Sequence, residues 1–149
     1  KGIVRQRIDY YEQISLINNY LTLTKIENTG AFLSVGHSLP QPIKLLLLTI
    51  LPIIALGLAF IYLLTKKGLS NLTIIGICFV VGGGIGNIYD RVIYGSVTDF
   101  LHIDLVIFQT GIFNMADVSI MTGMVLILFD SYFERTKLNY KAIDHHEGQ

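Results

Sequence analysis

Three long apolar runs dominate the chain and are separated by more polar stretches. They extend from Ile43 to Leu64, from Leu72 to Tyr89 and from Ile112 to Phe133. The first has 22 residues, which rise about 33 Å as a helix at roughly 1.5 Å per residue and so match the hydrocarbon core of a bilayer. The pattern predicts membrane spans over residues 43–65, 71–90 and 112–133.

The segments outside these runs include two that look like strands. Residues 14–35 are β-branched, aromatic and roughly alternating, so we expect one or two strands and a turn. Val97 to Ile107, within the connection 91–111, has the same character. We therefore predict one membrane-embedded domain over residues 1–149, mainly α-helical, whose spans form a bundle beside a small β region.

The charges near the span ends favour one orientation. Three spans place the Lys66–Lys67 connection and residues 134–149 on one face, and residues 1–42 and 91–111 on the other. The two faces carry five and six cations, so the totals do not decide. Short basic connections favour the cytoplasm. We expect 134–149 to be a cytoplasmic tail and 1–42 and 91–111 to be extracytoplasmic.

Composition agrees with a membrane protein and excludes some partners. Mean hydropathy is +0.57, and 15% of residues are charged where a soluble domain has about a quarter. The formal net charge is zero, which gives no field to attract nucleic acid. A single cysteine, Cys78, excludes an internal disulfide and a cysteine metal cluster. We expect no metal, no cofactor and no nucleic-acid partner.

The second apolar run is rich in glycine, with five between Gly76 and Gly86. Gly82 and Gly86 form a small-xxx-small pair, which in lipid lets a second helix backbone approach closely. We therefore predict that Gly82 and Gly86 form a packing seam, and that the glycines at 82, 83, 84 and 86 leave room for an acyl chain or a peptide backbone.

Polar residues gather where the second run ends and the third begins. Asn87 and Asp90 form an Asn-x-x-Asp pair, and Asn114 and Asp117 form another. Residues three apart share a helix face. Because consecutive spans are antiparallel, both pairs lie at the same side of the membrane.

Two further aspartates, Asp99 and Asp104, lie in the connection, and Arg91 follows Asp90. Four carboxylates and an arginine therefore converge at one interface. Two carboxyl groups in close approach share a proton, so that the ionised one activates water while the other donates. The symmetry of the two Asn-x-x-Asp pairs would select Asp90 and Asp117 for this chemistry.

Other interpretations stay open on these residues alone. Asp90 can simply pair with Arg91, while Asn114 and Asp117 cap a helix. A small transporter or channel subunit with a carboxylate relay for cations or protons is the alternative function, and a packing scaffold is a third. A relay should place carboxylates at several depths. The central parts of the three runs hold none.

The polar motifs resemble those of the lipoprotein signal peptidases, also called prolipoprotein signal peptidase II. The stretch Gly82 to Arg91 resembles that family's Gly-Gly-x-x-Gly-Asn-x-x-Asp-Arg box. Val97 to Phe100 resembles its Val-x-Asp-Phe segment, and Phe113 to Asp117 its Phe-Asn-x-Ala-Asp box. Asn28 to Ala31 is a weaker fourth match. Their order and spacing agree over essentially the whole chain.

The resemblance implies which residues carry the function. It makes Asp99 and Asp117 the catalytic pair, whereas symmetry selects Asp90 and Asp117. We prefer Asp99 to Asp90 because the adjacent Arg91 would hold the Asp90 carboxylate ionised, and Asp99 has no adjacent cation. The implied substrate-binding or supporting residues are Asn28, Gly30, Ala31, Gly83, Gly86, Asn87, Asp90, Arg91, Phe113, Asn114 and Ala116.

The resemblance also implies a fold, a substrate and a location. The family has four transmembrane helices and a small extracytoplasmic β-cradle, so the family's first helix is expected to be missing here except for Lys1. The implied reaction removes the signal peptide of a prolipoprotein just before its diacylglyceryl-modified cysteine, within the membrane. We expect a monomer in the bacterial cytoplasmic membrane, in contact with membrane lipid and with its active site near the extracytoplasmic face.

Overall fold

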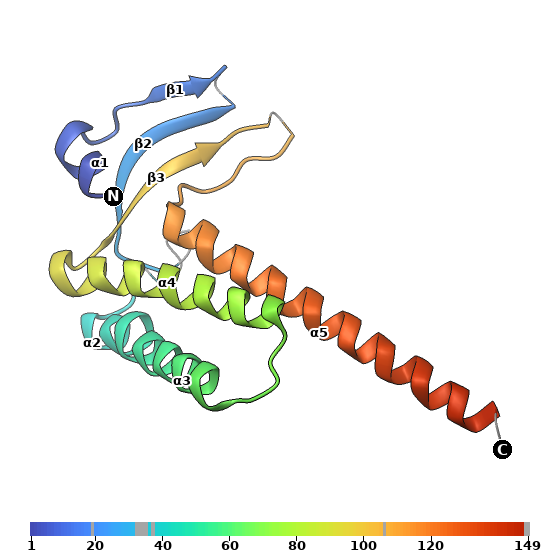
Figure 1. Cartoon of the computed structure of the whole chain (residues 1–149). Coiled ribbons are helices and arrows are strands. Elements are labelled where there is room, and N and C mark those ends of the chain that lie inside the picture. Colours follow the sequence, from blue (N-terminus) through green and yellow to red (C-terminus); the bar gives the residue numbers. More distant parts are fainter. Residues whose placement is uncertain (19, 32–35, 37, 106, 148–149) are drawn as a thin grey trace.

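The computed structural model describes residues 1–18, 20–31, 36, 38–105 and 107–147, with side chains as far as Lys137. Figure 1 shows the sheet lying over one end of α4, with α2 and α3 on the other side of that helix and α5 extending beyond both. The elements, in chain order, are α1 (Gly2–Arg7), β1 (Ile14–Ile17), β2 (Leu21–Asn28), α2 (Gln41–Leu45), η2 (Leu46–Ile50), α3 (Leu51–Thr65), α4 (Asn71–Tyr94), β3 (Val97–Ile103) and α5 (Met115–Glu147).

Three helical stretches are long and apolar enough to cross a membrane: Gln41–Thr65, Asn71–Tyr94 and Met115–Lys137. In the first, α2, η2 and α3 form one continuous helix, and the most apolar part of it has no buried residue. Large apolar side chains facing outward suit lipid as the surrounding medium, where they need no protein core to cover them. The expected fold class, a mainly helical membrane protein with a small β-sheet, is confirmed.

The wide helical turn η2 lies directly before Pro52. A proline has no N–H to donate to the carbonyl four residues earlier, here that of Leu48, and a π-type turn is one way for a helix to absorb the missing bond. This irregular segment faces the cavity described below.

The three strands form an antiparallel sheet in the order β1-β2-β3. β3 ends at Ile103, earlier than the strand-like sequence pattern, because Asp104 instead forms an isolated bridge with Gln109 as the chain reverses. The predicted 14–35 segment contains both β1 and β2; its residues 32–35 lie outside the described part. A small core of Val4, Ile8 and Phe100 attaches α1 to the sheet.

Helix α4 packs against both α3 and α5, and glycines set its closest approach to α5. A Cβ added at Gly83 would lie 2.5 Å from the carbonyl oxygen of Ala116, and one at Gly76 would lie 2.9 Å from that of Gly123. Gly82, in contrast, has nothing within 4 Å of an added Cβ, and Gly86 makes only an ordinary contact. The predicted Gly82–Gly86 seam is therefore corrected at Gly82, which faces none of the described residues within 4 Å. Gly86 does face Ala116 of α5, but the closest approaches between the two helices lie at Gly76 and Gly83.

The far end of the bundle has its own polar cluster. Ser70 caps α4 by accepting the backbone N–H of Thr73 at 3.0 Å. Asp130 of α5 accepts hydrogen bonds from the hydroxyls of Ser70 and Thr73, the latter at 2.6 Å. Asp130 thus joins the start of α4 to α5. It lies 13 residues after Asp117, about 20 Å along the helix at roughly 1.5 Å per residue, and so at the opposite end of the bundle.

Candidate active site

Asp99 is held on β3 and is almost completely buried, with 4% of its surface exposed. Alternate residues of a strand share a face, so Asp99 points to the same side as Val97, which lies opposite Asn28 in the β2–β3 register. The Asn28 side chain reaches diagonally across the sheet, and its Nδ2 donates to Asp99 Oδ2 at 2.9 Å.

Asn114 connects Asp99 to the helices. Backbone hydrogen bonds between Phe113 and Leu101 of β3, at 2.8 and 2.9 Å, hold the residue before it against the sheet. The Asn114 side chain is fully buried, and its Nδ2 donates to Asp99 Oδ1 at 2.7 Å. Its Oδ1 accepts the backbone N–H of Ala116 at 2.8 Å, so the same side chain caps α5.

Asp117 lies one turn into α5 and completes this arrangement. Its Oδ2 accepts the backbone N–H of Asn114 at 3.0 Å, which is the reciprocal bond of a capping box. Its Oδ1 accepts Asn87 Nδ2 from α4 at 2.8 Å. Asn114 therefore donates to both carboxylates, through its side chain to Asp99 and through its backbone to Asp117.

The environment favours a proton on Asp99. Burial raises the pKa of the Asp99 carboxyl above its ordinary value, because the charged form loses its hydration. The amide donors of Asn114 and Asn28 oppose this rise, while the negative charge of Asp117 adds to it. The Asp99 carboxyl therefore holds its proton more tightly than an ordinary aspartate does.

Asp90 lies in a different environment, although it too is buried, with 2% of its surface exposed. Its Oδ2 is 3.0 Å from Lys1 Nζ, and its Oδ1 is 3.2 Å from Arg5 Nη2. Lys1 Nζ also donates to Asn87 Oδ1 at 2.6 Å. The expected pairing of Asp90 with Arg91 is corrected: consecutive helical residues point in different directions, and two cations from the N-terminal segment take the place of Arg91.

Arg91 instead stabilises the turn after β2. One guanidinium nitrogen, Nη2, donates to the carbonyl oxygen of Gly30 at 2.8 Å. Within the turn, Asn28 Oδ1 accepts the N–H of Gly30 at 2.8 Å and Asn28 Nδ2 donates to the carbonyl of Ala31 at 2.9 Å. Arg91 therefore supports the turn that positions Asn28, and Asn28 in turn donates a hydrogen bond to Asp99.

A cavity of about 410 Å³ opens beside Asp117. Its polar lining comes from Asn87, Arg91 and Asp117, close to Ala31. Its remaining walls are apolar and come from η2, α3, α4 and α5. The other lining residues are Leu47, Leu48, Pro52, Gly84, Ile88, Ile120 and Met121.

Gly83 and Gly86, which were expected to bind or support the substrate, are not among the residues that line this cavity. Gly83 is pressed against Ala116, and Gly86 faces a second hollow beside Lys1. Gly84 lines the cavity, and a Cβ there would lie 2.5 Å from the side chain of Leu56. Asp104 is engaged elsewhere, since it accepts a hydrogen bond from Gln109 at 2.7 Å.

Sequence reasoning missed the cluster that fixes the N-terminal segment. Glu27 of β2 accepts hydrogen bonds from Ser96 at 2.6 Å and from Thr98 at 2.8 Å, and its carboxylate lies 3.7 Å from Arg5 Nε. The facing positions of Glu27 and Thr98 follow from the β2–β3 register. No sequence spacing predicts that register. The charges of Glu27 and Arg5 were the one available signal, because they are opposite in sign and could pair.

Fold and site together define a polytopic membrane protein with two carboxylates held by amides at one end of its helix bundle, one of them buried and the other on a cavity wall. A family model described as signal peptidase II matches residues 1–133. The chain therefore belongs to the signal peptidase II family, and the resemblance seen in its motifs is confirmed.

Three bacterial lipoprotein signal peptidases are similar in sequence to this chain over most of their length. A lipoprotein signal peptidase of Wigglesworthia glossinidia brevipalpis is 33% identical over 134 residues, which cover 83% of this chain and 86% of the relative. One from Aquifex aeolicus is 34% identical over 119 residues, which cover 80% of this chain and 70% of the relative. One from Streptococcus pneumoniae is 34% identical over 128 residues, which cover 86% of this chain and 79% of the relative.

Solved structures show the same fold. A bacterial membrane enzyme determined by the in meso method at 2.3 Å resolution superimposes with a TM-score of 0.81. It is 24% identical, and the match covers 91% of this chain and 80% of that one. A second, determined by the same method at 1.9 Å, gives a TM-score of 0.76 at 24% identity, with 87% and 80% covered.

Proposed function

We propose that the chain is an intramembrane aspartic endopeptidase that removes the signal peptide of a prolipoprotein just before the diacylglyceryl-modified cysteine. Membership of the signal peptidase II family supports the peptidase activity and the substrate class. The observation that carries the mechanism is the pair Asp99 and Asp117, which is bridged by Asn114 and has one member on the cavity wall.

The proposed reaction uses one proton on the pair and one water. Asp117, the ionised member, takes a proton from the water as its oxygen bonds to the scissile carbonyl carbon. Asp99, whose pKa is raised by burial, gives its proton to the carbonyl oxygen. The tetrahedral intermediate then collapses: one of its two hydroxyl groups returns a proton to Asp99 as the C=O bond re-forms, the C–N bond breaks, and the amine of the new N-terminal cysteine takes the proton held by Asp117.

The cavity accounts for a substrate that is part peptide and part lipid. Its polar end, at Asn87, Arg91 and Asp117, offers partners for a peptide backbone, whereas its apolar walls accept an acyl chain or an apolar signal sequence. Asp99 lies on β3, shortly after the second candidate span ends, and Asp117 lies in the first turn of the third. At this level water can reach the scissile bond while the acyl chains stay in lipid.

The proposal includes a place in the cell. The site faces the extracytoplasmic side of a bacterial cytoplasmic membrane, with Lys66 and Lys67 at the opposite, cytoplasmic end. The protein works as a monomer surrounded by membrane lipid. A carboxylate relay for transport is not favoured, because Asp99, Asp117 and Asp90 lie together at one end of the bundle and Asp130 is joined to Ser70 and Thr73 at the other.

The test is a cleavage assay with purified protein in detergent. The substrate is a diacylglyceryl-modified prolipoprotein, and the product is identified by mass as the chain that begins at the lipidated cysteine. An unlipidated version of the same prolipoprotein is the control and should remain intact. A metal chelator should leave the rate unchanged; inactivation by the chelator that added zinc reverses would overturn the aspartic mechanism.

A further inference from the structure

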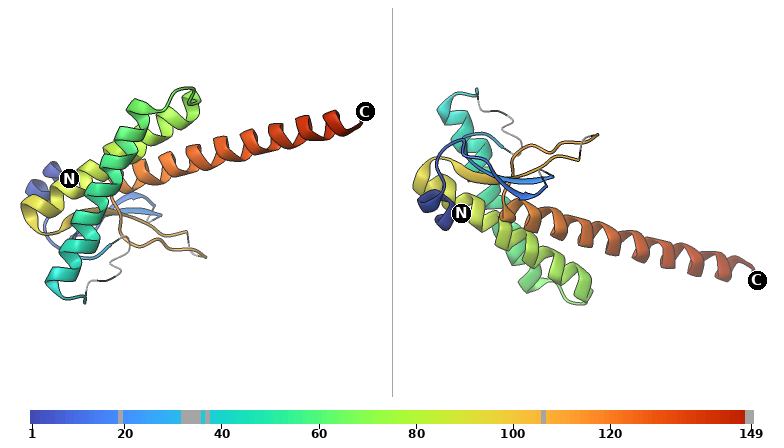
Figure 2. Two further views of the ribbon diagram at one scale, coloured as in Figure 1. Left: turned by 90° about the horizontal axis from the view of Figure 1, so that it is seen from below. Right: turned by 90° about the horizontal axis from the view of Figure 1, so that it is seen from above.

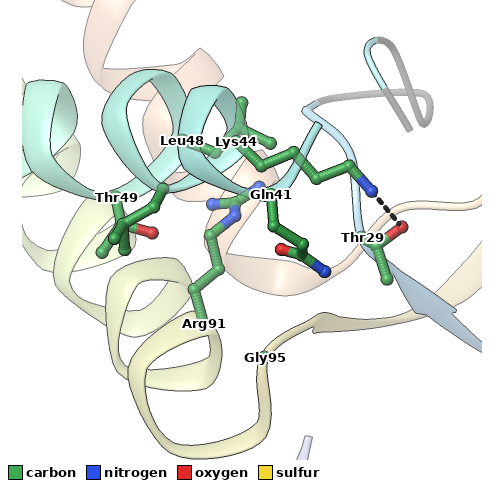
Figure 3. A pocket seen from close by; sticks show the side chains of 8 residues that line it. Thr29, Gln41, Lys44, Leu48, Thr49, Arg91 and Gly95 are labelled. Carbon is green, nitrogen blue, oxygen red and sulfur yellow. Dashed lines mark hydrogen bonds between the residues drawn. The ribbon is translucent and has the colours of Figure 1, made fainter. Parts of the chain in front are cut away.

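A second polar cavity, of about 180 Å³, lies between α2 and the end of α4. Figure 3 shows Lys44 and Gln41 extending from α2, and Arg91 reaching from α4 toward the same helix, with Thr29 at the side. The described residues that line it include two cations and no carboxylate. A cavity of this size is too small for a whole drug-sized ligand, whose pockets begin near 300 Å³, and has room for a compact group. Its two cations favour an anionic one.

Both cations have hydrogen-bonding capacity left for an anion. Lys44 Nζ makes one long hydrogen bond, at 3.4 Å, to the exposed hydroxyl of Thr29. Arg91 uses Nη2 for the carbonyl of Gly30, and a guanidinium carries five N–H donors in a fork that matches phosphate oxygens. An anion with several oxygens can therefore accept bonds from both side chains at once.

The position of the cavity identifies the source of that anion. Gln41 begins the first candidate span and Gly95 caps the end of the second, so the cavity lies where these helices leave the hydrocarbon. The phosphates of a bilayer lie at this level. Leu45, which also lines the cavity, is 55% exposed and offers an apolar surface for acyl chains.

We propose that this cavity binds the phosphate group of a membrane phospholipid. Lys44 and Arg91 contact the phosphate oxygens, while the acyl chains run along Leu45 into the bilayer. Leu48 and Arg91 also line the larger cavity beside Asp117, so the bound lipid lies next to the peptidase site. The proposal does not depend on the peptidase assignment, because lipid binding is measured directly.

The experiment measures binding of phosphatidylglycerol to purified protein in uncharged detergent by microscale thermophoresis. Lys44→Gln keeps the length of the side chain and removes its charge, and we expect affinity to fall about fivefold. Lys44→Arg should retain binding, which shows that the charge and not folding is responsible. Lys66→Gln, at the other end of the same helix, is the matched control and should bind like the unmodified protein.

Three outcomes would overturn the proposal. Equal weakening by Lys44→Gln and Lys66→Gln would mean that binding follows overall charge and not this cavity. Binding of neutral diacylglycerol as tight as that of phosphatidylglycerol would mean that no phosphate is recognised. Complete displacement of the lipid by inorganic phosphate at millimolar concentration would assign the cavity to a free phosphate in place of a lipid.

Discussion

Asp90 and the pair Asp99 and Asp117 lie at the same end of the helix bundle, yet their surroundings differ in kind. Asp90 is paired with two cations, Lys1 and Arg5. Asp99 and Asp117 receive hydrogen bonds from the neutral amides of asparagine side chains and from the backbone. A cation pairs with the charged form of a carboxylate, whereas an amide donates a hydrogen bond and brings no charge of its own. In the proposed mechanism the amide-held pair transfers protons, and Asp90 has a structural role.

The largest effect should come from removing a carboxylate of the amide-held pair. Asp99→Asn and Asp117→Asn should each lower kcat by about a hundredfold to ten-thousandfold, because each removes a group that transfers a proton in the proposed mechanism. Melting temperatures should change little, since asparagine keeps the shape of the side chain. Asp104→Asn, outside the network, is the control and should keep full activity. Full activity in Asp99→Asn would remove that residue from the mechanism.

The next largest effect concerns stability at Asp90. Asp90→Ala leaves Lys1 and Arg5 without their shared carboxylate, and breaking a buried pair costs about 3–5 kcal/mol of unfolding free energy. Thermal unfolding in detergent should show a clear fall in melting temperature relative to Asp104→Ala. If Asp90→Ala melts like that control but loses cleavage, the division between structural and chemical carboxylates is wrong.

A smaller effect should come from the helix seam that places Asn87 next to Asp117. In Gly83→Ala the added methyl would lie 2.5 Å from the Ala116 carbonyl, so α4 and α5 must separate. Overpacking of this kind costs about 1–3 kcal/mol and should lower both stability and kcat. Gly82→Ala, one residue earlier, meets open space and should behave normally. Equal behaviour of the two variants would mean that the seam does not position the pair.

The smallest effect is the pH dependence of stability that comes from Asp99. Burial raises the folded-state pKa of Asp99, so the folded protein holds this proton more tightly than the unfolded chain does. Its contribution to stability is therefore full at low pH and falls as pH rises from the unfolded value of about 3.9 through the raised folded-state pKa. Asp99→Asn should remove this fall. The comparison is melting temperature against pH for both proteins, and parallel curves would show that Asp99 is not perturbed.

The sequence predicts the parts of this structure that depend on local pattern. Apolar runs of bilayer length predict the three candidate spans, and Asn114-x-x-Asp117 predicts a helix start because its capping bonds form within one turn. Partners distant in the chain are not predictable in this way. Lys1 reaches Asp90 only because α1 packs on the sheet and the sheet on α4. Similarly, which of Gly82 and Gly83 faces α5 depends on the rotation of one helix against another, and a spacing of four residues does not specify that rotation.

Asn114 has a consequence for when the protein can act. Its side chain and backbone bind groups from β3, α4 and α5, and β2 supplies Asn28 to the same network. Before these four elements have docked, Asp99 and Asp117 lie on separate segments with nothing to align them. If the two carboxylates act as proposed, the peptidase becomes active only after the chain has been inserted and assembled.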